Sequence, residues 1–416
     1  MKIAVIGGGS TYTPELADGI GRLLPDVTDL VLVDPDPDRL AAVGPVSARI
    51  MAAHDHPADV SWTDSVDEGT EGADAVLFQL RIGGQAARHR DETWPLECGC
   101  VGQETTGAGG LAKALRTVPV VLDLAERARR RASPSAFIID FTNPVGIVTR
   151  ALLTAGHRTV GLCNVAIGFQ RGFARILGVD PGRISLGHVG LNHLTWERSV
   201  FLDGTDVLPE LLAKHVEEIA PHTGMPADFV RHLGMVPSSY LRYYYEHDAV
   251  VESLRGAETR AQAVARLEAE LLDLYADPDL DTKPPQLAQR GGAWYSEAAV
   301  DLLVSLTSDR GDVQVVNTFN HGTMPFLPDD AVIEVPAVIG AGGAEPVPVE
   351  PVQPLLRGLI AHAFAYEELA LDAALRGGRD RVYDALLAHP LVGQADQAEC
   401  LTDRLLAENA SYLPWA

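Results

Sequence analysis

Apolar runs alternate with amphipathic segments through the first 165 residues of the chain. The runs are short and rich in Val, Ile, Leu and Phe, as buried strands are, and the segments between them carry apolar residues at helical spacing. This pattern predicts strands at 2–7, 29–34, 73–80, 136–144 and 159–165, and helices at 13–24, 36–54 and 111–132. Strands that alternate with helices form a parallel sheet with helices on both faces. The sequence therefore predicts an N-terminal, Rossmann-like, doubly wound α/β domain.

The pattern changes after residue 166. Strand-like segments follow one another with short turns at 183–204, 312–322 and 331–340, and helical segments occupy 207–220, 256–275 and most of the tail from Val352. Mixed runs of this kind are typical of α+β structure. We therefore predict two domains, an α/β domain at 1–166 and a mixed α+β domain at 167–416.

The composition is that of an acidic protein with a large core. Of 416 residues, 46% are apolar, and the formal net charge is −24. Nucleic-acid binding needs a basic surface, and an anionic membrane repels so acidic a chain, so neither is an expected partner. No apolar run reaches the about 18–20 residues of a membrane span. The short run after Met1 leads into glycines rather than into a signal-peptide cleavage site.

Cysteine is sparse, with only Cys98, Cys100, Cys163 and Cys400 in the whole chain. Four cysteines are too few for a disulfide framework in a chain of this length. Cys98 and Cys100 stand two positions apart, which is not the spacing of a CxxC redox pair. We therefore expect a reducing, cytoplasmic setting.

The stretch GGGSTY directly follows the first predicted strand and opens a helix. Gly7 and Gly9 would allow a tight turn and a close approach of the backbone to a pyrophosphate, which the helix N-terminus then binds. Asp34 ends the second strand 25 residues after Gly9, where a carboxylate binds a ribose hydroxyl and favours NAD over NADP. Tyr12 occupies the third glycine position of the dinucleotide-binding motif. The alternative to dinucleotide binding is a glycine turn that binds no ligand.

Polar residues end two later strands of the predicted sheet. Asn143 ends one, and Cys163 stands at the end of the next. Open α/β sheets bind ligands off these carboxyl ends. His193 lies thirty positions after Cys163 in a β-like segment, so a thiolate and an imidazole could meet between the domains and hold a divalent ion. Both could equally be core residues, and Asn143 a turn residue before Pro144.

Other segments add candidate chemistry. The stretch 99–110 has five glycines, typical of backbone close to a ligand, and carries the polar residues Gln103, Glu104 and Thr105. Arg88 is one of two arginines in ARHRDE, which could instead form a solvated helix face. Tyr240 precedes three further tyrosines in SSYLRYYY. Such a stripe more often packs than reacts, although a tyrosine near a metal can act as a base.

Together these segments resemble glycoside hydrolase family 4, the NAD- and metal-dependent glycosidases, over essentially the whole chain. The resemblance is carried by VIGGGSTYTPEL, ARHRDE, GQETTGAGG, DFTNPVG, GLCNV, LNHL, PSSYLRYYY, RGGAWYSEAA and LPDDAVIEVPAV. It favours the 6-phospho-β-glucosidase branch, because the α-glucosidase branch typically has Asp after the metal cysteine and this chain has Asn164. It implies a fold like that of lactate and malate dehydrogenases, with NAD and a divalent metal, usually Mn²⁺, as cofactors. It also implies a phosphorylated glycoside as substrate and a homodimer or homotetramer.

The resemblance implies a role for each candidate residue. Cys163 and His193 would ligate the metal, and Tyr240 would be the base. The substrate would be contacted by Arg88, Asn143, Asn164 and Glu104, and its phosphate by Arg290 with Ser10 and Thr11. The cofactor would be bound by Gly7, Gly9, Ser10, Thr11 and Asp34. NAD binding would fall to residues 1–166, and substrate, metal and oligomer contacts to 167–416. Hydrolysis would proceed by oxidation at C3, loss of the C2 proton, elimination at C1, water addition and re-reduction, not by paired carboxylates.

Several alternatives remain open. Within the family they are a 6-phospho-α-glucosidase, which Asn164 disfavours, and an α-galacturonidase or α-galactosidase. His321 and Phe326 replace the polar residues that the family pattern has, which leaves the outer substrate contacts, or a subunit contact, undefined. Outside the family, a 2-hydroxy-acid dehydrogenase could use His193 in a proton relay. The remaining hypothesis is a non-catalytic NAD-binding sensor.

Overall fold

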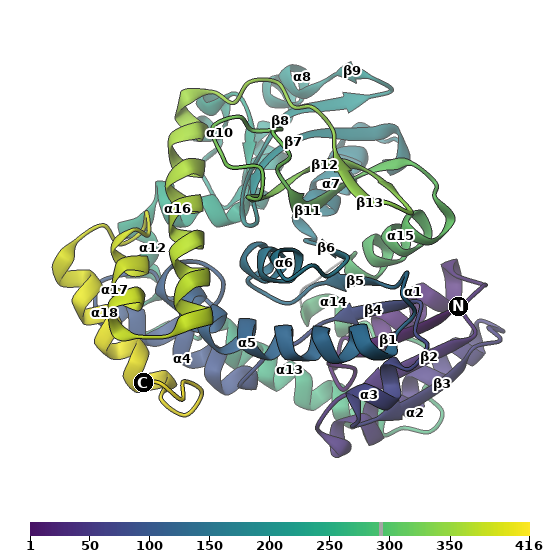
Figure 1. Cartoon of the computed structure of the whole chain (residues 1–416). Helices are drawn as coiled ribbons and strands as arrows, with labels where there is room; N and C mark the ends of the chain where they lie inside the picture. Colours follow the sequence, from purple (N-terminus) through teal and green to yellow (C-terminus); the bar gives the residue numbers. More distant parts are fainter. Residues whose placement is uncertain (291–293) are drawn as a thin grey trace.

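The computed structural model describes residues 1–290 and 294–416 and is built on one continuous sheet (Figure 1). Among the described residues the strand order is β3–β2–β1–β4–β5–β6–β11–β12–β7–β8–β10, with β9 beside β8 and β13 beside β12. The first six strands are parallel: β1 (Lys2–Ile6), β2 (Asp29–Val33), β3 (Asp59–Thr63), β4 (Ala75–Phe78), β5 (Phe137–Asp140) and β6 (Thr159–Gly161). The predicted α/β class is confirmed.

Five of these six parallel strands are buried because helices cover both faces of the sheet, whereas the edge strand β3 is largely exposed. Ile3 and Val5 pack into one core with α1 (Thr13–Leu23), α2 (Pro37–Ala53) and α15 (Tyr295–Ser308), whereas Ala4 and Ile6 pack into the other with α5 (Gly107–Arg131) and α6 (Val145–Thr154). Successive side chains of a strand point to opposite faces, so a strand covered on both sides is apolar throughout. This is why the apolar runs predicted the five buried strands well.

The antiparallel half of the sheet continues from β6, above the parallel half in Figure 1. Its strands are β7 (Ile184–Leu191), β8 (Leu194–Leu202), β9 (Thr205–Asp206), β10 (Val236–Pro237), β11 (Asp312–Phe319), β12 (Val332–Gly340) and β13 (Gly343–Pro346). His193 was expected inside a strand, but it lies in the two-residue turn between β7 and β8 with a φ of 63°. A left-handed backbone is uncommon for a residue other than glycine and is often found at functional sites.

Helices surround the sheet and close the molecule. Besides those above they are α3 (Val66–Thr70), α4 (Gly84–Glu97), α7 (Val165–Leu177), α8 (Leu208–Lys214), α9 (Val216–Thr223), α10 (Ala227–Leu233), α11 (Arg242–Tyr245), α12 (His247–Leu254), α13 (Arg260–Tyr275), α14 (Leu287–Arg290), α16 (Pro354–Arg376), α17 (Arg379–Leu387) and α18 (Ala395–Asn409). Over the described part of the chain, every helix is too short or too polar to cross a membrane.

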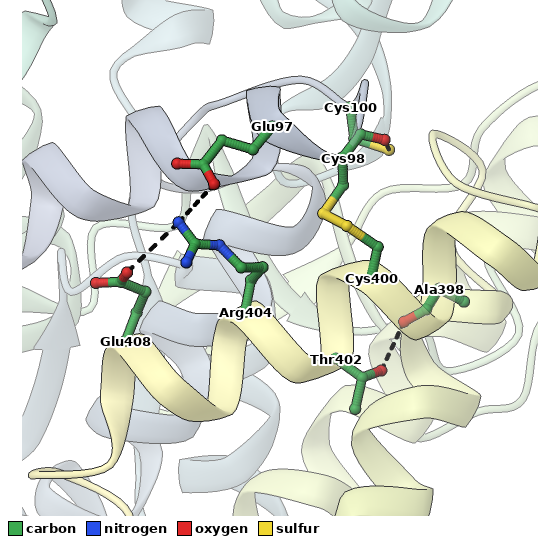
Figure 2. The surroundings of a disulfide bond; sticks show 8 residues. All are labelled: Glu97, Cys98, Cys100, Ala398, Cys400, Thr402, Arg404 and Glu408. Atoms are coloured by element: carbon green, nitrogen blue, oxygen red, sulfur yellow. Dashed lines mark hydrogen bonds and ion pairs between the residues drawn. A yellow bond between two sulfur atoms is a disulfide. The ribbon is translucent and has the colours of Figure 1, made fainter.

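The C-terminal helices return to the N-terminal half, where α18 packs against α4 and α5 (Figure 1). A disulfide joins Cys98, at the end of α4, to Cys400 on α18, and Arg404 pairs with Glu97 beside it at 2.6 Å (Figure 2). The expectation of cysteines without disulfides is therefore wrong for this pair. Sequence spacing gave no indication of it, because 302 positions separate the two residues.

The disulfide predicts a redox-dependent stability. Cys400→Ser should lower the free energy of unfolding by about 2–5 kcal/mol, because the cross-link restricts the unfolded chain over a long loop. The midpoint temperature of thermal unfolding of the wild type should fall to that of the variant when dithiothreitol is added. The midpoint of the variant should not change. As a control, Cys100→Ala removes a buried free thiol and should keep the dithiothreitol response. Equal midpoints for wild type and Cys400→Ser without reductant would contradict the prediction.

Candidate active site

A cavity of about 1100 Å³ lies along the carboxyl ends of the parallel strands. Most of the site residues predicted from the sequence line it: Gly7, Ser10, Asp34, Arg88, Glu104, Asn143, Asn164, His193, Tyr240 and Arg290. Gly9, Thr11 and Cys163 are buried, and each is next in the chain to a residue that lines the cavity. The position is the one where open α/β sheets bind ligands. The fold thus gathers residues from the two predicted domains around one cavity.

The glycine loop is shaped by close contacts that only glycine permits. Gly7 has a φ of 89°, and a Cβ there would lie 2.7 Å from the carbonyl oxygen of Gln79. A Cβ at Gly9 would lie 2.8 Å from the Asp34 side chain, whose Oδ2 accepts a 3.0 Å hydrogen bond from the Gly9 N–H. Burial raises the pKa of Asp34. The backbone before α1, which carries no side chains at the glycines, and the carboxylate at the end of β2 fit a dinucleotide.

The three residues expected at a phosphate do come together. Arg290 donates from Nε to Thr11 Oγ1 at 2.9 Å and from Nη2 to Ser10 Oγ at 3.4 Å. Sequence reasoning missed Glu268 of α13, which accepts from Arg290 at 2.9 Å and from Gln85 at 3.2 Å. A bound phosphate would therefore share Arg290 with a carboxylate that is already in place.

Glu104 is the centre of a buried charge cluster. It accepts from Lys113 at 2.6 Å, lies 3.1 Å from Arg88 Nη2, and also pairs with Arg81. Burial acts to raise the pKa of Glu104, but Arg81, Lys113 and Arg88 outweigh it and hold the pKa well below its usual range. Burial and the charge of Arg81 lower the pKa of Lys113 to about 7. The carboxylate is thus placed to orient Arg88 toward the cavity.

The glycines after Glu104 have a packing role that differs from the expected one. Gly107 and Gly109 belong to the first turn of α5 rather than to an open loop. A Cβ at Gly109 would lie 2.3 Å from the Gln103 carbonyl oxygen and 2.5 Å from that of Asp91. These glycines bring α5 against α4 and so hold the polar stretch 103–105 at the cavity.

His193 and Tyr240 face each other in the lining of the cavity. Their rings are stacked with centroids 3.7 Å apart and planes within 9°. Burial lowers the pKa of His193 to about 4, so the imidazole is neutral near pH 7. Burial, with the nearby Cys163, raises the pKa of Tyr240, and burial with Glu334 raises that of Cys163. Tyr240 is thus a neighbour of both Cys163 and His193.

These donors fit a divalent cation that also binds substrate oxygens. A thiol and an imidazole are available, and Asn143, which lines the same cavity as His193, has a buried Oδ1 atom that finds no hydrogen-bond partner among residues 1–290 and 294–416. Among residues 1–290 and 294–416, no group of three or more His, Cys, Asp or Glu side chains is arranged to hold a metal. Such a cation would complete its coordination with substrate or water, and its charge would favour the ionised thiol.

A buried polar network beside the β7–β8 turn, which carries His193, was missed from the sequence. Glu334 of β12 accepts from Asn192 at 2.8 Å and contacts His188 Nε2 at 3.1 Å, and His188 Nδ1 lies 2.6 Å from Glu197. Burial opposes protonation of His188, but the two carboxylates raise its pKa to about 10. The one sequence signal was a glutamate inside the apolar strand VIEVPAVIG, because a lone buried charge needs partners.

A second cavity of about 500 Å³ adjoins the first and shares Asn164, Ser239 and Tyr240 with it. Trp294 lines it with 40% of its surface exposed, and Arg171 lies 4.3 Å from the Trp294 ring centre. His321 and Phe326, where the chain departs from the family pattern, line neither cavity; Phe326 instead packs against the core beneath β7 and β8.

Comparison with known families identifies both halves of the chain. Residues 2–179 match the model of the family 4 glycosyl hydrolases, and residues 188–392 match the model of the family 4 glycosyl hydrolase C-terminal domain. A probable 6-phospho-β-glucosidase of Bacillus subtilis is 38% identical over 100% of this chain and 97% of its own length.

Solved structures agree with this assignment. The 6-phospho-β-glucosidase of Thermotoga maritima, solved with manganese, NAD⁺ and glucose 6-phosphate, superposes with a TM-score of 0.93, 33% identity and 99% coverage of both chains. Malate dehydrogenase from Aeropyrum pernix has a TM-score of 0.54 at 16% identity, covering 89% of this chain and 97% of its own. At that identity the second likeness concerns the fold alone, which confirms the expected dehydrogenase-like architecture.

Proposed function

Because the chain belongs to family 4 of the glycosyl hydrolases, we propose that it hydrolyses 6-phospho-β-glucosides to glucose 6-phosphate and the aglycone, using NAD and a divalent cation, Mn²⁺ in the first instance. The observation that carries the proposal is the stacking of Tyr240 on His193 in the cavity that also holds the glycine loop and Asn143. The 33–38% identical relatives named 6-phospho-β-glucosidase support the substrate class. Asn164, in place of Asp, supports the β branch.

Each side chain then has a defined task. Bound NAD⁺ would accept and return the hydride at C3 of the sugar, and the bound cation would act as a Lewis acid on the neighbouring oxygens. Cys163 and His193 hold the cation, and Arg88 and Asn143 orient the sugar. Arg290, with Ser10 and Thr11, binds the 6-phosphate by charge-assisted hydrogen bonds.

Tyr240 removes the proton at C2 once C3 is oxidised. Its raised pKa keeps the phenol protonated in the free protein, so it becomes a base only when positive charge is bound nearby. Loss of the C2 proton and of the C1–oxygen bond is an elimination, after which water adds at C1. Because hydride leaves C3 and later returns to it, the reaction produces no net NADH.

The experiment that tests the proposal uses protein stripped of metal and nucleotide. p-Nitrophenyl β-D-glucopyranoside 6-phosphate and its unphosphorylated parent are assayed with NAD⁺, Mn²⁺ and dithiothreitol, singly and together. We expect nitrophenol from the phosphorylated compound only, and only when both cofactors are present. Release without NAD⁺ would rule out the redox mechanism, and release from the unphosphorylated parent would show that the 6-phosphate is not required. The α-linked 6-phosphate, assayed alongside, tests the branch.

A further inference from the structure

We infer that Gln103 and Thr105 fix the tautomer of His193, so that Nδ1 carries the ring proton and Nε2 keeps its lone pair for a cation. The two residues act as positioning residues, since neither needs to touch substrate or cofactor. The inference rests on the proposed function only in taking Nε2 as the metal-binding atom. The tautomer itself follows from hydrogen bonds between the loop before α5 and the β7–β8 turn.

The orientation of the Gln103 amide is the first step. Its Oε1 atom faces the backbone N–H of Thr106 at 2.8 Å and also that of Thr105. A backbone N–H can only donate, so the amide atom that faces two of them must be the oxygen and not the nitrogen. The Gln103 side chain therefore presents an acceptor, and nothing but an acceptor, at this point.

The hydroxyl of Thr105 is the second step. Its Oγ1 atom lies 2.9 Å from the same Gln103 oxygen and 3.0 Å from Nδ1 of His193. Unless the hydroxyl proton points to Gln103, two acceptor oxygens face each other at hydrogen-bond distance with no proton between them. A hydroxyl has one proton, so with that proton given to Gln103 it can only accept from His193. Nδ1 of His193 must therefore be N–H.

The third step connects the tautomer to the site. His193 is buried, stacked on Tyr240, and held in a left-handed turn, so its ring has little freedom to rotate. A neutral imidazole with its proton on Nδ1 has its only free lone pair on Nε2. Metal-binding histidines generally donate their second ring N–H to a neighbour that fixes their orientation. The hydrogen bonds that connect Gln103, Thr105 and His193 meet that requirement before a cation binds.

The direct test is ¹⁵N NMR of histidine-labelled, metal-free full-length protein. His193→Gln identifies the His193 ring signals among the 13 histidines. We expect the wild type to show a protonated Nδ1 and an unprotonated Nε2. Thr105→Val removes the acceptor at nearly constant volume and should transfer the proton to Nε2, whereas Thr105→Ser should retain the wild-type tautomer. Thr106→Val is the matched control, because it removes a hydroxyl from the adjacent residue and should leave the tautomer unchanged.

A wild type with its proton on Nε2 overturns the inference, and that result does not depend on any substitution at Thr105. An unchanged tautomer in Thr105→Val overturns it as well. Co²⁺ titration, followed by the thiolate-to-cobalt absorption band, gives the second readout, and Thr105→Val should weaken binding by about 10–100-fold with rescue in Thr105→Ser. If the tautomer shifts as expected but Co²⁺ binding does not change, the inference about the tautomer holds. In that case the metal-binding role of His193 in the proposed function is wrong.

Discussion

Tyr240→Phe is expected to lower kcat for hydrolysis by about 10²–10⁴-fold, the usual contribution of a positioned general base, and to leave KM within about threefold. The substitution removes only the phenolic oxygen. The ring, which stacks on His193 at 3.7 Å and lies 6.2 Å from the ring of Tyr243, keeps its packing. Steady-state kinetics on the nitrophenyl 6-phosphoglucoside with both cofactors would measure the effect.

Proton exchange separates the loss of a base from a general loss of activity. In D₂O the wild type should exchange the C2 proton of glucose 6-phosphate, whereas Tyr240→Phe should not, although NADH should still form on the enzyme. Tyr244→Phe is the matched control, because Tyr244 packs against His389 and is absent from the cavity lining. Unimpaired C2 exchange in Tyr240→Phe would show that another group is the base.

The sequence predicted the parallel half of the fold well but missed its edge. Strand β1 was expected at 2–7 and runs from Lys2 to Ile6, since burial on both faces makes such a strand apolar throughout. Strand β3 was not predicted, because it is the outer strand and its residues, Asp59–Thr63, are largely exposed. The apolar signal is weak here because the side chains on the two faces of this strand are only partly covered.

The site could be named from the sequence only in part. Motifs and the resemblance pointed to Cys163, His193 and Tyr240, and the structure places His193 and Tyr240 in contact. The partners of charged residues could not be predicted. Glu268 pairs with Arg290 and contacts Thr11, which lies 257 positions earlier, and such pairings depend on tertiary packing rather than on local spacing. The same holds for Glu104 with Arg81, and for the disulfide.

Cys163→Ser is expected to weaken Mn²⁺ binding by at least about tenfold and to lower the rate of hydrolysis by more than about 10³-fold. A serine hydroxyl does not ionise near neutral pH, so the cation loses an anionic ligand and the charge balance around Tyr240 changes. NAD⁺ binding should be retained, because the glycine loop and Asp34 lie at other strands of the sheet. Electron paramagnetic resonance of free Mn²⁺ and calorimetry with NAD⁺ would measure the two affinities separately.

The pH dependence of Mn²⁺ binding makes the same prediction more specific. Burial and Glu334 raise the pKa of the Cys163 thiol above its ordinary value, so the metal-free protein holds the thiol proton at neutral pH. Binding through the thiolate must then release that proton, so the affinity of the wild type should rise with pH throughout the neutral range. In Cys163→Ser this rise should disappear, whereas Cys100→Ser, which alters the other free thiol, should keep it. A pH-independent wild-type affinity would show that the cation is held without the thiolate.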